Sequence, residues 1–241
     1  MKLSEILSKS VDIITEQPQI LAVYIIPLAL SLVAMWVRAT NMISWGIYRL
    51  APLGRSPLQF FTYFVAALRV MNVLSWVMWI IVLVVLGVCV ALTIVMANAG
   101  LSGRTMKIGE AFDSISGKLP LFIVAFLISW FLKFVGMFFF WVGMFVPAVL
   151  LIFVGQSVLL DNKDLFDSFS TSYDLAKTRW IEILVLLFVF LVVLAIVRVI
   201  PVLGVIVACF LMGYSAVVFT VMYKEGGRAP ARRAPRRAPA E

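Results

Sequence analysis

The sequence predicts an all-α integral membrane protein: a polytopic bundle of six transmembrane helices with three amphipathic helices at its inner surface. Of its 241 residues, 63% are hydrophobic and only 13% are charged, and the mean hydropathy is +1.10. Soluble domains contain about 25% charged residues, so this composition excludes an ordinary soluble fold. The apolar residues also form long runs, and the lysines and arginines are distributed unevenly between those runs.

The number of spans follows from the length of the apolar runs. A helix needs about 20 mostly apolar residues to cross a bilayer, which predicts spans at residues 20–37, 74–96, 119–138, 142–160, 180–197 and 202–223. The apolar block at 119–160 is about twice the length of one crossing, so we predict two helices joined by a tight turn near Gly136 to Gly143. Arg198 and Pro201 mark the turn between the last two spans. Residues 1–225 therefore form a single transmembrane domain.

Three stretches that precede spans resemble one another and predict an internal repeat. They begin near residues 3, 108 and 165, and each combines an acidic residue with a serine-containing amphipathic segment. In the third copy, the apolar residues Phe166, Phe169, Tyr173 and Ala176 share one helical face. A short amphipathic helix with charges of both signs cannot span, so we expect all three to lie at the membrane surface. The chain then consists of three units of interfacial helix, span and span. The alternative is that these helices are ordinary connectors without repeat ancestry.

The positive charges predict that both termini are cytoplasmic. In this topology most of the 20 lysines and arginines, and all 12 acidic residues, lie in inner segments, as the positive-inside rule favours for Lys and Arg. The six basic residues on the outer side are Lys133, Arg198 and four in the first outer loop, residues 38–73, which carries Arg38, Arg49, Arg55 and Arg69 and no acidic residue. The disposition of this loop stays open.

The stretch from Gly109 to Tyr223 resembles a known family. The segments GEAFDSISGKLPLF, FVPAVLL, VLLDNKDLFDSFSTSYDLAKTRW and TVMYKE look like the membrane domain associated with glycerophosphodiester phosphodiesterases and with related uncharacterised prokaryotic membrane proteins. The resemblance covers about residues 105–225 and implies a helical bundle with interfacial helices. It implies no phosphodiesterase activity, which in those enzymes belongs to a separate soluble domain, and no catalytic residue.

The residue types argue against catalysis. The sequence contains no histidine, which excludes histidine-dependent mechanisms. Asp161, Asp164, Asp167 and Asp174 cluster in one inner connector and could hold a divalent cation. The preferred interpretation is structural, with Asp164 as helix cap and Asp167 beside the positive helix end. We therefore predict no enzyme activity, no cofactor and no metal.

Few ionisable or helix-breaking residues fall within the spans. Lys133, Glu182 and Arg198 lie in spans or at their boundaries; we interpret them as interfacial anchors, with a transport role as the alternative. Pro27 and Pro147 are interpreted as simple helix kinks, although transporters use such breaks to line a cavity. Gln156 is expected to form hydrogen bonds between helices.

The tail, residues 226–241, contains Arg228, Arg232, Arg233, Arg236 and Arg237 in a loose RAP repeat. Too few apolar residues are present to offset the entropy of ordering, so we predict disorder. No aromatic or base-reading residue interrupts the arginines, so nucleic acid is not the expected partner. The arginines are expected to contact anionic headgroups at the cytoplasmic face, or a docking partner.

The sequence therefore predicts a non-enzymatic, multi-pass protein of the cell membrane with a structural, regulatory or lipid-organising role. The alternative is a transporter or channel for a small or lipid-like solute. A membrane enzyme acting on lipids ranks third. A homo-oligomer or another membrane protein stays open as a partner.

Overall fold

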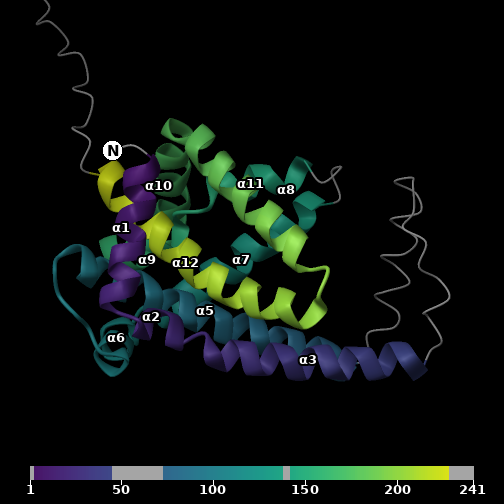
Figure 1. Ribbon diagram of the computed structural model, residues 1–241. Coiled ribbons are helices and arrows are strands. Elements are labelled where there is room, and N and C mark those ends of the chain that lie inside the picture. Colours follow the sequence, from purple (N-terminus) through teal and green to yellow (C-terminus); the bar gives the residue numbers. More distant parts are fainter. Residues whose placement is uncertain (1–2, 45–72, 138–141, 228–241) are drawn as a thin grey trace, which may run out of the picture.

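The computed structural model describes residues 3–44, 73–137 and 142–227, and within these ranges the chain is helical and contains no strand (Figure 1). Six segments are long and apolar enough to span a membrane, as the sequence predicts: Gln19–Val37, Val73–Leu101, Leu119–Gly136, Gly143–Asp161, Trp180–Val197 and Pro201–Gly226. The predicted six-span, all-α bundle is therefore confirmed. Two of the spans each consist of two consecutive helices, and three further helices are too short to span, so the described helices outnumber the spans.

The element order has the predicted three units. The first contains α1 (Leu3–Glu16), the interrupted span α2 (Gln19–Ala22) with α3 (Ile25–Ser44), and α5 (Val73–Leu101). The second contains α6 (Ile108–Ile115), α7 (Leu119–Met137), and the interrupted span α8 (Val142–Leu150) with α9 (Val154–Asp161). The third contains α10 (Leu165–Thr178), α11 (Trp180–Val197) and α12 (Pro201–Gly227).

The second span of each unit occupies the centre of the bundle. The buried share of the most apolar window is 44%, 39% and 39% in the second spans, against 22%, 17% and 17% in the first spans. The first spans α3, α7 and α11 therefore lie at the periphery, where their apolar side chains are available to lipid.

The contacts between units follow a cyclic order. Each amphipathic helix contacts the second span of the preceding unit: α6 contacts α5, α10 contacts α9, and α1 contacts α12. Each peripheral span contacts its own second span and that of the preceding unit: α3 contacts α5 and α12, α7 contacts α9 and α5, and α11 contacts α12 and α8. Because α1 and α3 dock on α12, the three units close into a ring instead of forming a row.

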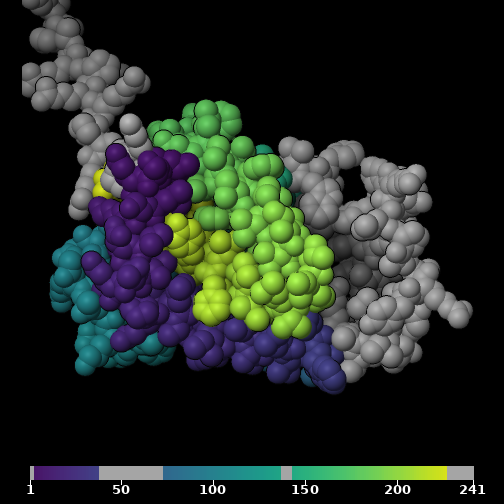
Figure 2. Space-filling view, in the orientation of Figure 1, coloured from purple at the N-terminus to yellow at the C-terminus, as the bar shows by residue number. Residues whose placement is uncertain are grey.

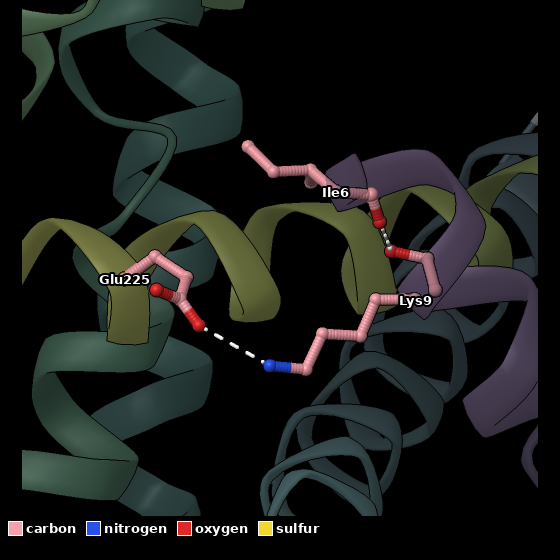
Figure 3. A network of polar contacts seen from close by, with 4 residues as sticks. Ile6, Lys9 and Glu225 are labelled. Atoms are coloured by element: carbon pink, nitrogen blue, oxygen red, sulfur yellow. Dashed lines mark hydrogen bonds and ion pairs between the residues drawn. The ribbon is translucent and has the colours of Figure 1, made fainter. Parts of the chain in front are cut away.

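The contact between α1 and α12 closes this ring. Figure 2 shows α1, in purple, lying against the yellow end of α12. Ile6, Ser10 and Ile13 form the buried face of α1, and the Ser10 hydroxyl donates to the Ile6 carbonyl at 2.7 Å instead of remaining unpaired. At its edge, the Lys9 ammonium lies 3.2 Å from Glu225 near the end of α12 (Figure 3).

The apolar block at 119–160 forms two spans, as predicted. The helices α7 and α8 contact each other closely, and a Cβ atom on Gly136 would collide with the carbonyl group of Gly143. Only glycine at position 136 allows the two backbones to approach this closely.

The three amphipathic helices and the last turn of α12 lie at one end of the bundle, hereafter the charged end (Figure 1). The spans alternate in direction, so the end of α3 and the turn between α11 and α12 lie at the opposite end. Of the described Lys, Arg, Asp and Glu residues, only Arg38, Lys133 and Arg198 lie away from the charged end.

Candidate functional site

The fourth span is interrupted between α8 and α9, at Leu151–Phe153, and a serine from another helix satisfies the break. The hydroxyl of Ser172 in α10 donates to the Leu150 carbonyl at 2.7 Å and accepts from the Phe153 N–H at 3.1 Å. Ser172 is completely buried. Backbone polar groups inside a membrane protein need partners, and here one hydroxyl supplies both. The sequence did not point to this role, because serine in an amphipathic helix carries no distinguishing signal.

Pro147 lies inside α8, ahead of this break. Having no N–H, it cannot donate to the Gly143 carbonyl, but the helix continues past it, and Leu151 N–H donates to the Pro147 carbonyl at 3.0 Å. The ladder then shifts to the shorter spacing Val154 to Leu151 at 3.4 Å. The interruption thus begins four residues after the proline rather than at it.

Pro27 lies in the first turn of α3, just after the break between α2 and α3 at Val23 and Tyr24. Because Pro27 has no N–H for the Val23 carbonyl, that carbonyl is open to another donor, and the Cys89 thiol of α5 lies 3.2 Å from it. The break is further fixed by Tyr24, whose hydroxyl lies 3.2 Å from Thr93 Oγ1. Both proline-associated breaks are therefore closed by side chains of neighbouring helices.

A cavity of about 120 Å³ lies between α5, α7, the α8–α9 break and α12. We call it the central cavity. Most of its wall is apolar, with the rings of Phe122, Phe126 and Phe219 prominent. The polar lining residues are Ser129, Trp130, Lys133, Gln156 and Ser215.

Lys133 is the charged residue of the central cavity. The sequence predicts an anchor at the membrane boundary, and Lys133 lies four residues before the end of α7. Its side chain also lines the cavity. The ammonium lies 5.7 Å from the centre of the Trp130 ring, and no carboxylate pairs with it among the described residues. The residue is half-buried, and a cation–π contact stabilises a cation by about 0.5–2 kcal/mol.

Gln156 is the buried amide of the same cavity. Its side chain is 3% exposed, and its carbonyl oxygen has no hydrogen-bond partner in the described part of the chain. The predicted hydrogen bond between helices is therefore not formed by this oxygen. A buried carbonyl without a partner is uncommon and needs an explanation.

The two serines of the cavity are already paired. Ser129 donates to the Ala125 carbonyl at 2.8 Å, and Ser215 donates to the Met212 carbonyl at 2.8 Å. Their hydroxyl hydrogens are used within their own helices. Lys133, Gln156 and the Trp130 indole N–H are thus the cavity groups without a hydrogen bond to another side chain or backbone group among the described residues.

At the charged end, polar contacts join the central helices. Asp161, at the end of α9, accepts a hydrogen bond of 2.5 Å from Tyr223 and lies 3.8 Å from the Lys224 ammonium. Lys118, before α7, donates to the Leu159 carbonyl at 3.0 Å. These contacts stabilise the junction of α7, α9 and α12 at this end.

The other predicted residues have structural surroundings. Glu182 pairs with Arg179 at 3.8 Å, and Arg198 lies in the turn between α11 and α12, where Gly204 packs against it. Asp164 occupies the N-cap position of α10, but its side chain forms no capping hydrogen bond, so that part of the prediction is wrong. Among the described residues, no three side chains form a metal-binding group. The tail arginines lie outside the described residues.

The predicted apolar face of α10 is not buried as a whole against the bundle. The face buried against the bundle consists of Ser168, Ser172 and Ala176, while Phe166 is 84% exposed and Tyr173 46% exposed. Small residues let α10 approach α9 closely. Phe166 and Tyr173 are left exposed, while Phe169 packs against the core.

Comparison with known protein families, with curated proteins and with solved structures finds no match.

Proposed function

We propose that this chain is a non-enzymatic integral membrane protein that binds and organises anionic lipids, with its charged end on the cytoplasmic side of the cell membrane. The observation that carries the proposal is the exposure of aromatic side chains on amphipathic helices that are themselves firmly docked. Phe112 is 45% exposed and Phe166 is 84% exposed, although their helices bury other faces against α5 and α9.

Aromatic side chains at a charged protein surface are typical of the membrane interface, where rings enter the acyl region and charges meet headgroups. Lys107 precedes Phe112 in the chain, and Lys163 and Lys177 flank Phe166, with the acidic residues Glu110, Asp113, Asp164 and Asp167 interspersed. Each basic residue near an anionic membrane surface contributes about 1 kcal/mol, and the five tail arginines add to this charge. With both termini cytoplasmic, the arrangement also agrees with the positive-inside rule.

The absence of histidine from the sequence supports a non-enzymatic role. So does the pairing of Asp161, which is engaged by Tyr223 and Lys224. The resemblance to a phosphodiesterase-associated membrane domain is part of this proposal and adds no catalytic residue to it.

The test is the association of spin-labelled lipids with the reconstituted protein. We expect more immobilised phosphatidylglycerol than phosphatidylcholine, and less of this preference after the five tail arginines are replaced by glutamine. Phe166→Ser should also lower lipid association. The matched control is Val199→Ser, since Val199 is 82% exposed at the opposite end. Equal association of the two lipids, or equal effects of the two serine variants, would contradict the proposal.

A second candidate, a transporter or channel for a small or lipid-like solute, is favoured by the interrupted fourth span beside the central cavity. Transporters place such breaks where a substrate binds. Saturable flux of a solute into liposomes containing the protein would support this candidate over the lipid-organising role, and the absence of flux would reject it.

A further inference from the structure

The central cavity contains a positive charge that the protein does not balance. Lys133 is the charged residue of the lining, and none of the lining residues is acidic. The Trp130 ring faces the ammonium at 5.7 Å, but an aromatic face offers only a weak counter-charge. Lys133 is half-buried in a membrane-spanning helix, where a cation is retained at a cost unless an anion or water lies beside it. Among the described residues no carboxylate balances it, and an anion from outside the chain would do so.

Gln156 adds an independent requirement. Its carbonyl oxygen is buried without a partner among the described residues and belongs to a lining residue of the same cavity. This oxygen calls for a hydrogen-bond donor. A ligand that meets both groups must therefore carry negative charge and also a donating hydrogen.

The size of the cavity limits the ligand further. A volume of about 120 Å³ equals that of about four water molecules, well below the roughly 300–1,000 Å³ of sites for drug-sized ligands. Only a group of a few heavy atoms fits. The apolar rings around it leave no place for a large polar molecule.

We propose that the central cavity binds a phosphate group that retains a proton, with Lys133 donating to its charged oxygens and Gln156 accepting from its hydroxyl. A phosphate monoanion is the simplest oxyanion that provides both acceptors and a donor. It can enter as free phosphate or as the headgroup of a phosphate monoester lipid, such as lysophosphatidic acid. This site is separate from the lipid contacts proposed at the charged end. Phosphate binding at the site does not depend on the transport candidate; only movement of the bound group across the membrane does.

The experiment measures binding of radiolabelled inorganic phosphate to the full chain in nanodiscs of zwitterionic lipid, with lysophosphatidic acid as competitor. The wild-type chain should bind saturably. Removing a charge-assisted hydrogen bond in Lys133→Gln should weaken binding by about tenfold or more. Gln156→Leu should weaken it as well, and Arg198→Gln is the matched control because Arg198 lies outside the cavity. Its affinity should equal that of the wild type.

Gln156→Glu is a second test of the site, in case Lys133→Gln does not fold. It supplies the missing negative charge within the cavity, so the variant should fold and lose phosphate binding. Saturable phosphate binding identifies the free anion as ligand. Binding of labelled lysophosphatidic acid alone, dependent on Lys133, identifies the lipid. No saturable binding of either probe, or equal binding by the wild type and Lys133→Gln, overturns the proposal. Binding of either probe without its flux across the membrane supports the proposed site and rejects the transport candidate.

Discussion

The Lys9 ammonium lies 3.2 Å from a carboxylate oxygen of Glu225, so the first helix of the chain is paired with the last. The pair spans 216 positions in sequence. It marks the contact through which the third unit meets the first and closes the ring of three units. Its energetic role, however, is smaller than its position suggests, because the Lys9 side chain is 38% exposed.

We expect the apolar face of α1, rather than this ion pair, to hold the ring closed. Lys9→Gln should change the unfolding free energy by about 1 kcal/mol or less, whereas Ile6→Ala should cost about 2–5 kcal/mol because Ile6 is completely buried. Thermal unfolding in nanodiscs measures both. Val11→Ala is the control on the same helix, since Val11 is 50% exposed. A larger loss from Lys9→Gln than from Ile6→Ala would show that the ion pair dominates.

Ser172→Ala should destabilise the break in the fourth span. The change leaves the Leu150 carbonyl and the Phe153 N–H without their partner, and each unsatisfied buried group costs about 1–3 kcal/mol. Hydrogen exchange at the Phe153 amide should accelerate along with the loss in unfolding free energy. Thr178→Ala, an exposed change whose hydroxyl bonds only within α10, should be nearly neutral. Unchanged exchange at Phe153 would argue against the bridging role.

Gly136→Ala should disturb the hairpin of α7 and α8. A methyl group there collides with the Gly143 carbonyl, and overpacking of this kind costs about 1–3 kcal/mol. Gly109→Ala is the natural control, because no atom lies within 4 Å of a Cβ at that helical position. It should be neutral or stabilising, since alanine favours a helix over glycine. The midpoints of thermal unfolding of the two variants should therefore move apart.

Lys133→Met should raise the midpoint of thermal unfolding in the absence of phosphate, because replacing a half-buried cation that has no carboxylate partner among the described residues by an apolar side chain removes its desolvation cost. Added phosphate should then stabilise the wild type but not the variant, as expected for a ligand that binds only the folded state. An unchanged midpoint in both conditions would instead support the role of Lys133 as an anchor at the membrane boundary.

The proposed topology can be checked by thiol labelling. In a chain with Cys89→Ser and Cys209→Ser, which keeps small polar groups at the two buried thiols, Lys177→Cys and Val199→Cys place one thiol at each end of the bundle. An impermeant thiol reagent added to intact cells should label position 199 and not position 177. Labelling of position 177 alone would reverse the orientation.

Much of the architecture could be predicted from local sequence. The six spans follow from run length, and the three short amphipathic helices α1, α6 and α10 follow from their mixed periodicity. The two halves of the block at 119–160 were also predictable, because one helix of that length would exceed the bilayer. Each of these inferences depends only on residues that are neighbours in the chain.

The site was less accessible to prediction. Pro27 and Pro147 indicated where spans are weakened, but not that Cys89 and Ser172 would satisfy the breaks. From its distance along the helix, the sequence predicts Lys133 to be a boundary residue, and it predicts Gln156 to be a packing residue. Their shared cavity depends on the rotation of α7 and α9 about their axes, which the pattern of an almost uniformly apolar helix does not reveal.

Run length and charge thus decide how many times the chain crosses the membrane, because each crossing needs an apolar run as long as the hydrocarbon core of the bilayer is thick. The closed order of the three units, the serine that joins α8 to α9, and the unbalanced cation that α7 directs toward the central helices arise only from packing. Between helices that are all apolar, the hydrophobic effect does not choose neighbours; small residues, backbone partners and a few polar side chains make that choice.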